Sequence, residues 1–386
     1  MSHEPESPPP KQKSRKWLVA LLVLLLGGTF VFLWNSDFVL FPKPQTATVL
    51  VLDNCDDDFR TPPFTDTLSA FGPGGTRRWI ATNLNHCQTV GGSRALSVSP
   101  DGRFLLVCEE AAKHLKAYET QTGQQLWSLD GQFNSAAVAP NGTVYALASS
   151  GTIYGDRTLL VDKSGCVITS GSASGFDIAL DAKREVIWLV GKFIKKCDLR
   201  LNVLQELNPI KWCGVSVDIC PDGSIWVAER EHSNVAQSTN RILQISAEGQ
   251  IRKSVYLQWS PMCLRVDPAD GAIWVTGIAV NQPFTKPVLD AIEKRTGALP
   301  LGKWLRALLT KYRVSYKTHK YDADGTLLRQ LDRGGCSLAL QPSDQSVWLA
   351  GKDKIYHYSR DGSLLATRGG VSSDQKSVVV VPELGQ

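Results

Sequence analysis

The chain has 386 residues, 43% of them hydrophobic, which is enough for two ordinary domains or for one large repeat domain. Its formal net charge is +5 at pH 7, and residues 1–16 carry +2 of it. The +3 left for the rest of the chain is too small for a nucleic-acid-binding surface, so we expect no nucleic-acid partner.

The first predicted element is a transmembrane helix over residues 17–34, which carry no charge. Such a helix would be about 27 Å long, close to the thickness of the hydrocarbon core of a bilayer, and Trp17 and Trp34 mark its two ends. Basic residues lie only on its N-terminal side, so we expect residues 1–16 to be a cytoplasmic tail and the rest of the chain to be exported. A cleaved signal peptide is the alternative, although its apolar region would usually be shorter.

Residues 35–45 contain Pro42 and Pro44 and are predicted to form a short, stiff linker. Residues 46–386 then repeat one pattern, a turn followed by a short apolar strand. Two early copies carry Phe104 and Tyr145 as the large residue of that strand, and four later copies carry a tryptophan, at positions 188, 226, 274 and 348. Period-2 alternation points each of these tryptophans to the same side of its strand, so we expect them to pack between neighbouring units.

The spacing of the turns predicts the fold class. Pro100, Pro140, Asp181 and Pro221 follow one another at intervals of 40, 41 and 40 residues. A period near 40 with several short strands in each period is typical of a β-propeller, an all-β fold. One unit divides into four expected strands, which cover residues 96–98, 103–108, 114–118 and 124–129.

Six units of this kind are complete, and the two chain ends are expected to share a seventh that closes the ring. In this split unit we expect a second strand at residues 376–381, a third at 48–52 and a fourth at 76–80. Only residues 370–373 are then left for its innermost strand. The prediction is therefore seven blades, with six or eight as alternatives.

Residues 217–229, followed by 240–245 and Glu248-Gly249, resemble an NHL-type repeat. They are also similar to the repeats of streptogramin-lyase-like and regucalcin-like propellers, and the resemblance covers about residues 46–386. It implies the propeller fold and leaves the function open, because these families include binding scaffolds, lactonases and lyases. For the lyase-like members it implies His and Glu residues at the centre of the ring together with a divalent metal.

One segment interrupts the period. Residues 279–318 are inserted between the second and third strands of the fifth complete unit, and short helices are expected at 287–294 and 303–312. In the second helix an apolar face that includes Trp304 lies beside basic residues, which is typical of a helix that binds a partner's groove or an anionic membrane. The candidate binding residues are Lys303, Trp304, Arg306 and Lys311. The alternative is a flap that packs on its own propeller.

Candidates for catalysis and metal binding are sparse. Glu229 and His232 share one loop after a tryptophan strand and are the only Glu/His pair placed in this way, so they are the candidate general acid/base residues. Asp56 and Asp58 lie on an acidic loop after a strand and could offer oxygen ligands to Ca²⁺ or another divalent metal, although the spacing is not that of an EF-hand. We expect a solvated turn there and predict no cofactor.

The predicted protein is thus a single-pass membrane protein with an exported propeller that acts as a binding scaffold for a protein or an envelope ligand. The alternative is a metal-dependent lyase or a lactonase-type hydrolase of the streptogramin-lyase or regucalcin kind.

Overall fold

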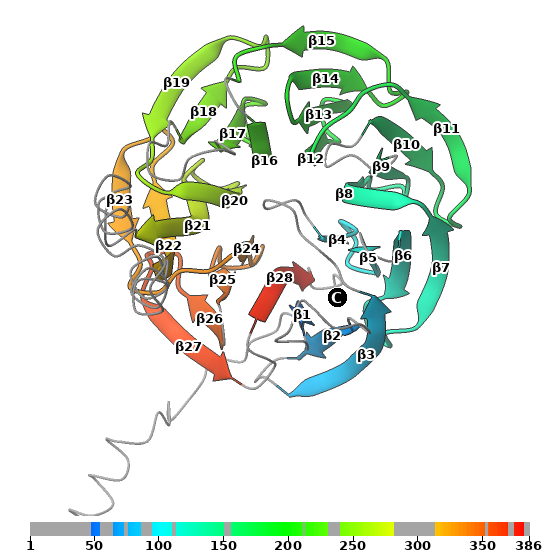
Figure 1. The fold of residues 1–386 in the computed structure, drawn as a ribbon, viewed down its shortest axis with the longest axis horizontal. Coiled ribbons are helices and arrows are strands. Elements are labelled where there is room, and N and C mark those ends of the chain that lie inside the picture. Colours follow the sequence, from blue (N-terminus) through cyan, green and yellow to red (C-terminus); the bar gives the residue numbers. More distant parts are fainter. Residues whose placement is uncertain are drawn as a thin grey trace, which may run out of the picture. The chain divides into compact units, whose positions relative to one another are not determined.

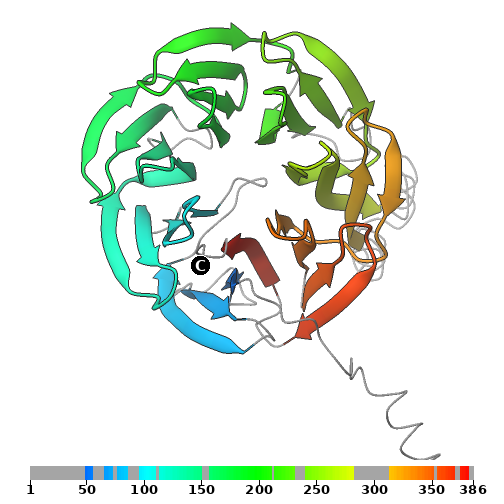
Figure 2. The same ribbon diagram turned by 180° about the vertical axis from the view of Figure 1, so that it is seen from behind.

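The computed structural model describes residues 48–54, 65–72, 76–85, 95–109, 113–149, 156–210, 213–230, 240–281, 313–351, 354–369 and 374–381. All of them belong to the second of two compact units, Thr46–Gln386. They form seven four-stranded antiparallel sheets, which stand around a common axis as the blades of a propeller (Figures 1 and 2). The predicted all-β, seven-bladed fold is confirmed. No helix among these residues is long and apolar enough to cross a membrane, and residues 17–34 lie outside them.

Six blades consist of four consecutive strands each, counted here from the axis outward. Blade 1 contains β4 (Leu96–Val98), β5 (Phe104–Glu109), β6 (His114–Glu119) and β7 (Gln125–Asp130). Blade 2 contains β8 (Gln132–Val138), β9 (Val144–Ser149), β10 (Arg157–Val161) and β11 (Val167–Gly171). Blade 3 contains β12 (Asp177–Asp181), β13 (Val186–Val190), β14 (Ile194–Asp198) and β15 (Val203–Leu207).

The remaining complete blades follow the same order. Blade 4 contains β16 (Cys213–Ile219), β17 (Ile225–Arg230), β18 (Arg241–Ile245) and β19 (Ile251–Tyr256). Blade 5 contains β20 (Ser260–Val266), β21 (Ile273–Asn281), β22 (Arg313–Tyr321) and β23 (Leu327–Gln330). Blade 6 contains β24 (Ser337–Leu340), β25 (Val347–Ala350), β26 (Lys354–Tyr358) and β27 (Leu364–Gly369).

Blade 7 is shared between the two ends of the ring, as predicted, but its strands differ from the prediction. It contains β28 (Asp374–Val381), β1 (Thr48–Asn54), β2 (Thr65–Phe71) and β3 (Arg77–Asn85). The C-terminal strand is therefore innermost and β1 is second, each one place closer to the axis than expected. β2 was not predicted, because three polar residues begin it and only Leu68, Ala70 and Phe71 carry its apolar pattern.

The connections alternate between the two faces of the ring because every blade has the same antiparallel order. Turns from first to second and from third to fourth strand lie on one face, called here the turn face. Connections from second to third strand and from one blade to the next lie on the other, the loop face. The stretches 55–64, 86–94, 231–239 and 282–312 all join strands that end at the loop face. In contrast, β1 begins at Thr48 and β28 ends at Val381 on the turn face.

The first-to-second turns of blades 1 and 4 have the sequence Pro-Asp-Gly, which favours a tight turn. In blade 4 the Gly223 backbone has φ of 85°, a left-handed conformation that costs glycine little, and its N–H donates to the Cys220 carbonyl at 2.9 Å. The Asp222 carboxylate accepts from the Ser224 N–H at 2.9 Å, which closes the turn. The turn thus holds the inner strand against the tryptophan strand.

The four repeated tryptophans are at most 1% exposed and belong to the packing of the blades, as predicted. Two of them are covered by a lysine whose ammonium bridges to the next blade. Lys196 Nζ lies 5.4 Å from the centre of the Trp188 ring and donates to the Ala247 carbonyl at 2.7 Å. Lys320 Nζ lies 5.2 Å from the Trp274 ring and donates to the Arg360 carbonyl at 2.8 Å. The tryptophan rows therefore join blade 3 to 4 and blade 5 to 6.

Buried polar side chains connect the inner strands of successive blades. Asp177 on β12 is fully buried and accepts from Ser135 Oγ on β8 at 2.8 Å and from the Val217 N–H on β16 at 3.0 Å. From β16, Asp218 Oδ2 accepts from the Val266 N–H on β20 at 2.9 Å. We call these contacts the inner latches. They fix neighbouring inner strands in register, because a buried donor or acceptor without its partner costs about 1–3 kcal/mol.

The strands that flank the insertion in blade 5 are longer than predicted. β21 and β22 stay paired as far as Asn281 and Arg313, which face each other across the ladder. Residues 279–281 and 313–318 of the predicted insertion therefore belong to strands. The helices expected at 287–294 and 303–312 lie outside the described residues.

Replacing Glu185 with glycine should stabilise the ring. Glu185 is exposed and holds φ of 56° in the first-to-second turn of blade 3, where blade 4 has Gly223. The left-handed conformation costs an L-residue about 1–2 kcal/mol, and the added flexibility of glycine returns part of that gain. We expect Glu185→Gly to raise the free energy of unfolding in urea by about 0.5 kcal/mol.

The matched control is Gly223→Ala. A Cβ at this position would meet the Arg184 side chain and would have to adopt a positive φ, so this change should lower the free energy of unfolding by about 1 kcal/mol. A destabilising Glu185→Gly would show that the turn conformation is not strained.

Candidate functional site

Glu229, the candidate acid or base, is part of a buried ion pair at the end of β17. Its side chain is 0% exposed, and its Oε2 lies 2.5 Å from Nε of Arg241 on the adjacent strand β18. Arg241 also donates through Nη2 to the Pro209 carbonyl at 2.9 Å, in the connection that leads into β16. The carboxylate therefore joins strands of blade 4 and is held away from solvent.

The other predicted site residues cannot be placed with it. His232, Asp56, Asp58, Lys303, Trp304, Arg306 and Lys311 all lie outside the described residues. No group of three metal-ligating side chains is formed by the residues that the structure does describe. The seven described cysteines form no disulfide, and burial raises the pKa of the Cys213 thiol to about 12.

Blade 1 contains a second buried pair between the second and third strands. Glu109, at the end of β5, is 0% exposed, and its Oε1 lies 2.9 Å from Nζ of Lys116 on β6. Both pairs combine a glutamate at the end of the second strand with a cation on the third. Glu109 was not predicted as a site residue, and it lies one position farther along its strand than Glu229 does, since it is seven residues after Gly102 and Glu229 is six after Gly223.

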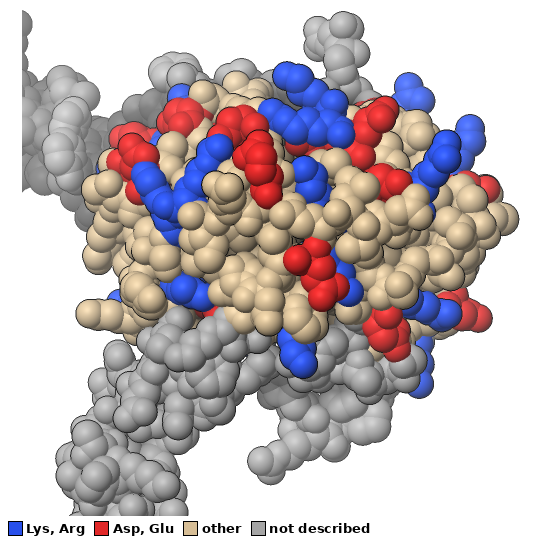
Figure 3. Space-filling view, turned by 90° about the horizontal axis from the view of Figure 1, so that it is seen from above, with Lys and Arg blue, Asp and Glu red and all other residues tan. Residues whose placement is uncertain are grey.

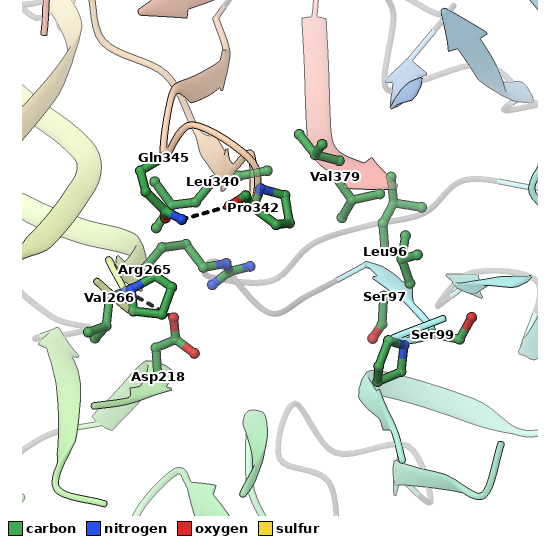
Figure 4. Close-up of a pocket in the computed structure, with 15 residues that line it drawn as sticks. Leu96, Ser97, Ser99, Asp218, Arg265, Val266, Leu340, Pro342, Gln345 and Val379 are labelled. Carbon is green, nitrogen blue, oxygen red and sulfur yellow. Dashed lines mark hydrogen bonds between the residues drawn. The ribbon is translucent and has the colours of Figure 1, made fainter. Parts of the chain in front are cut away.

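The central channel contains a better candidate for a site. A cavity of about 290 Å³ opens at the turn-face end of the axis, between the inner strands of five blades (Figure 4). Its walls are mainly apolar and include Leu96, Leu340 and Val379. Ser97, Asp218, Arg265 and Gln345 supply the polar lining, and Figure 4 shows the Arg265 side chain reaching from β20 into the open space. The volume is at the lower end of the range for small-molecule sites.

Arg265 takes its position from the register of blade 5. It lies directly opposite Trp274 in the β20–β21 ladder, and in blade 4 Asp218 lies opposite Trp226. Blades 3 and 6 have Ala179 and Ala339 at the equivalent place. Two adjacent blades thus place opposite charges where others place a methyl group. Counting back from the tryptophans in the sequence could have found both residues.

Comparison with known proteins supports the fold. No family model matches the chain, and no curated protein sequence matches it. Among solved structures, hydrazine synthase from Kuenenia stuttgartiensis is similar with a TM-score of 0.59 and 14% identity, over 77% of this chain and 91% of that one. A functionally unknown protein from Desulfotomaculum acetoxidans DSM 771 is similar with a TM-score of 0.58 and 11% identity, over 87% and 99%. At these identities the similarity shows the fold alone.

Glu229→Gln should destabilise the protein strongly. The substitution leaves the largely buried Arg241 guanidinium without its counter-charge, and breaking a buried pair in this way costs about 3 kcal/mol. We expect a loss of that order in the free energy of unfolding, measured by urea denaturation.

The matched control is Glu206→Gln, which removes the half-exposed partner of Lys195 and should cost less than about 1 kcal/mol. If Glu229→Gln proved as mild as the control, Glu229 would not be a structural residue, and its role as an acid or base would be open again.

Proposed function

We propose that the protein is a membrane-tethered, extracytoplasmic β-propeller that binds a protein or an envelope ligand and does not catalyse a reaction. The observation that carries this choice over an enzyme is the ion pair of Glu229 with Arg241. A general acid or base has to reach the proton that it transfers, and Glu229 is fully buried behind its partner. The alternative, a metal-dependent lyase or lactonase of the NHL-related kind, would need its acidic groups in the channel.

The ring suits a binding role because its blades are fixed to one another. The inner latches connect blade 2 to 3, 3 to 4 and 4 to 5, and the lysine-covered tryptophans connect blade 3 to 4 and 5 to 6. Figure 3 shows acidic and basic side chains interspersed over the rim of the ring, which fits a protein partner better than a polyanion. Such a rigid ring can present long connections without being deformed by what they bind.

We assign the partner to the loop face. The chain enters the ring at Thr48 on the turn face, so a membrane anchor at residues 17–34 would precede that face in the chain. The insertion with Lys303, Trp304, Arg306 and Lys311 connects β21 and β22 at the opposite face. Because the strands that the insertion joins end at the loop face, we place the protein or envelope partner there.

Removing the insertion should abolish partner binding and leave the ring folded. Asn281 and Arg313 are paired across the ladder, so residues 282–312 can be replaced by Asn-Gly, which closes a two-residue hairpin turn. We expect the melting temperature to change by no more than a few degrees, and crosslinking of the anchored protein to its partner to be lost.

The matched control exchanges Lys303, Arg306 and Lys311 for glutamine within the full insertion, which removes charge and keeps length. Partner capture that survives both changes in a folded ring would refute the assignment to the insertion.

Alkaline phosphatase fused after Gln386 should be active, because we expect this end of the chain to lie outside the cytoplasm. Basic residues lie only on the N-terminal side of residues 17–34, which predicts export of everything that follows. The measurement is a pair of fusions, one to alkaline phosphatase and one to a fluorescent protein that matures only in the cytoplasm. Phosphatase activity without fluorescence is expected, and the reverse result would exclude the proposed topology.

A further inference from the structure

We infer that the turn-face mouth of the channel is a binding site for a small molecule that carries an oxyanion, a carboxylate or a phosphate, and that Arg265 holds this group. The inference does not depend on the proposed partner of the loop face. It rests on a cation and an acceptor that no described residue pairs, and on apolar side chains, which together line one cavity of about 290 Å³.

The guanidinium of Arg265 forms no ion pair with a described aspartate or glutamate. It carries five N–H donors, and Nη1 donates to the Leu264 carbonyl of its own strand at 2.7 Å. Asp218 lines the same cavity, but its Oδ2 accepts from the Val266 N–H in an inner latch. Among the described residues, the remaining donors of Arg265 have no acceptor, and an oxyanion in the cavity would supply one.

The contrast with other arginines of the turn face is clear. Arg184 Nη1 lies 2.8 Å from Asp181 Oδ2, and Arg252 Nη1 lies 2.9 Å from Asp222 Oδ2. Arg360 contacts both Asp267 and Asp270 at 2.8 Å. Each of these cations has its carboxylate within the protein, whereas Arg265 extends into the cavity (Figure 4). An oxyanion that binds there would supply the missing charge through the bidentate contact that guanidinium favours.

Gln345 supplies the second feature. Its Nε2 donates to the Pro342 carbonyl at 2.8 Å, which fixes the orientation of the amide. Its Oε1 is then a buried acceptor for which the described residues provide no donor. Gln345 lines the same cavity, although Oε1 itself is shielded from it, so a ligand with an N–H or O–H group beside its oxyanion would satisfy this atom once the amide turns toward the cavity.

The walls set the third property of the ligand. Leu96, Val98, Val266, Leu340 and Val379 line the cavity beside the polar groups. A few polar groups in an apolar pocket are typical of small-molecule sites, where they orient the ligand. The expected ligand is thus compact, with an oxyanion, a neighbouring donor and a small apolar group.

N-acetyl-L-leucine combines these properties and serves as the carboxylate probe, and glycerol 3-phosphate serves as the phosphate probe. N-acetyl-L-leucinamide, which lacks the charge, is the neutral control. Binding to the full-length protein in non-ionic detergent would be measured by isothermal titration calorimetry. We expect at least one charged probe to bind, and the probe that binds more tightly identifies the oxyanion.

Arg265→Gln should weaken that binding at least tenfold, because hydrogen bonds to charged groups are the stronger kind. Arg265→Lys should restore part of the affinity. Gln345→Gly should weaken binding of N-acetyl-L-leucine a few-fold without harming the turn, since Gln345 already holds a positive φ of 58°. Arg252→Gln, which removes a paired arginine of the same face, should bind like the wild type.

Melting temperatures show whether each variant is folded, and Gln345→Gly keeps the test valid if Arg265→Gln fails to fold. The inference is overturned if neither charged probe binds the wild type, or if the neutral amide binds as tightly as the acid. It is also overturned if a folded Arg265→Gln variant keeps its affinity, or if Arg252→Gln loses as much.

Discussion

The ring depends on the pairing of its last strand with its first. Seven residue pairs join β28 to β1, from Val381 opposite Thr48 to Asp374 opposite Asn54. Without this ladder, β1 would be an open sheet edge, and the buried face of Val378 and Val380 would have no place in the ring. β28 is also the innermost strand of its blade, so the strand that closes the ring also lines the channel. The shape of the channel therefore depends on this closure.

Within the closed ring, neighbouring blades are joined by polar contacts that involve different residues from one pair of blades to the next. Asp177 connects three successive inner strands, and farther out Lys196 connects blade 3 to the third-to-fourth turn of blade 4. The two Asp177 contacts are buried, so blade 3 cannot rotate without breaking hydrogen bonds to blade 2 and to blade 4. Side chains on the inner strands therefore have defined positions around the axis. A charged side chain such as Arg265 is held at the channel by this frame rather than by partners of its own.

The properties that recur in every repeat could be predicted from the sequence, and the features that differ from the repeat could not. Spacing of the turns gave seven blades, the strands of residues 96–129 and the burial of the tryptophans, because each of these properties recurs with the period. The order of strands in the closing blade was wrong, since β2 begins Thr-Asp-Thr and carries too few apolar residues to be recognised. Glu229 looked like a loop residue beside His232. Its burial follows from Arg241, twelve positions later, and such a pairing across two strands is visible only once their register is known.

Polar residues that lie opposite the tryptophans have different surroundings on the third strands and on the inner strands. Opposite Trp226 and Trp274 on the third strands lie Gln244 and Lys320, and opposite them on the inner strands lie Asp218 and Arg265. Of the outer partners, Lys320 donates to the Arg360 carbonyl of the next blade. The inner strand is the last strand of the blade on the side of the axis, so a charged residue on it borders the channel. Asp218 meets this condition by joining an inner latch, whereas Arg265 bonds only to its own strand within the described residues. A guanidinium that contributes no contact between blades adds little to the stability of the ring, and this is why its place in the channel points to a ligand.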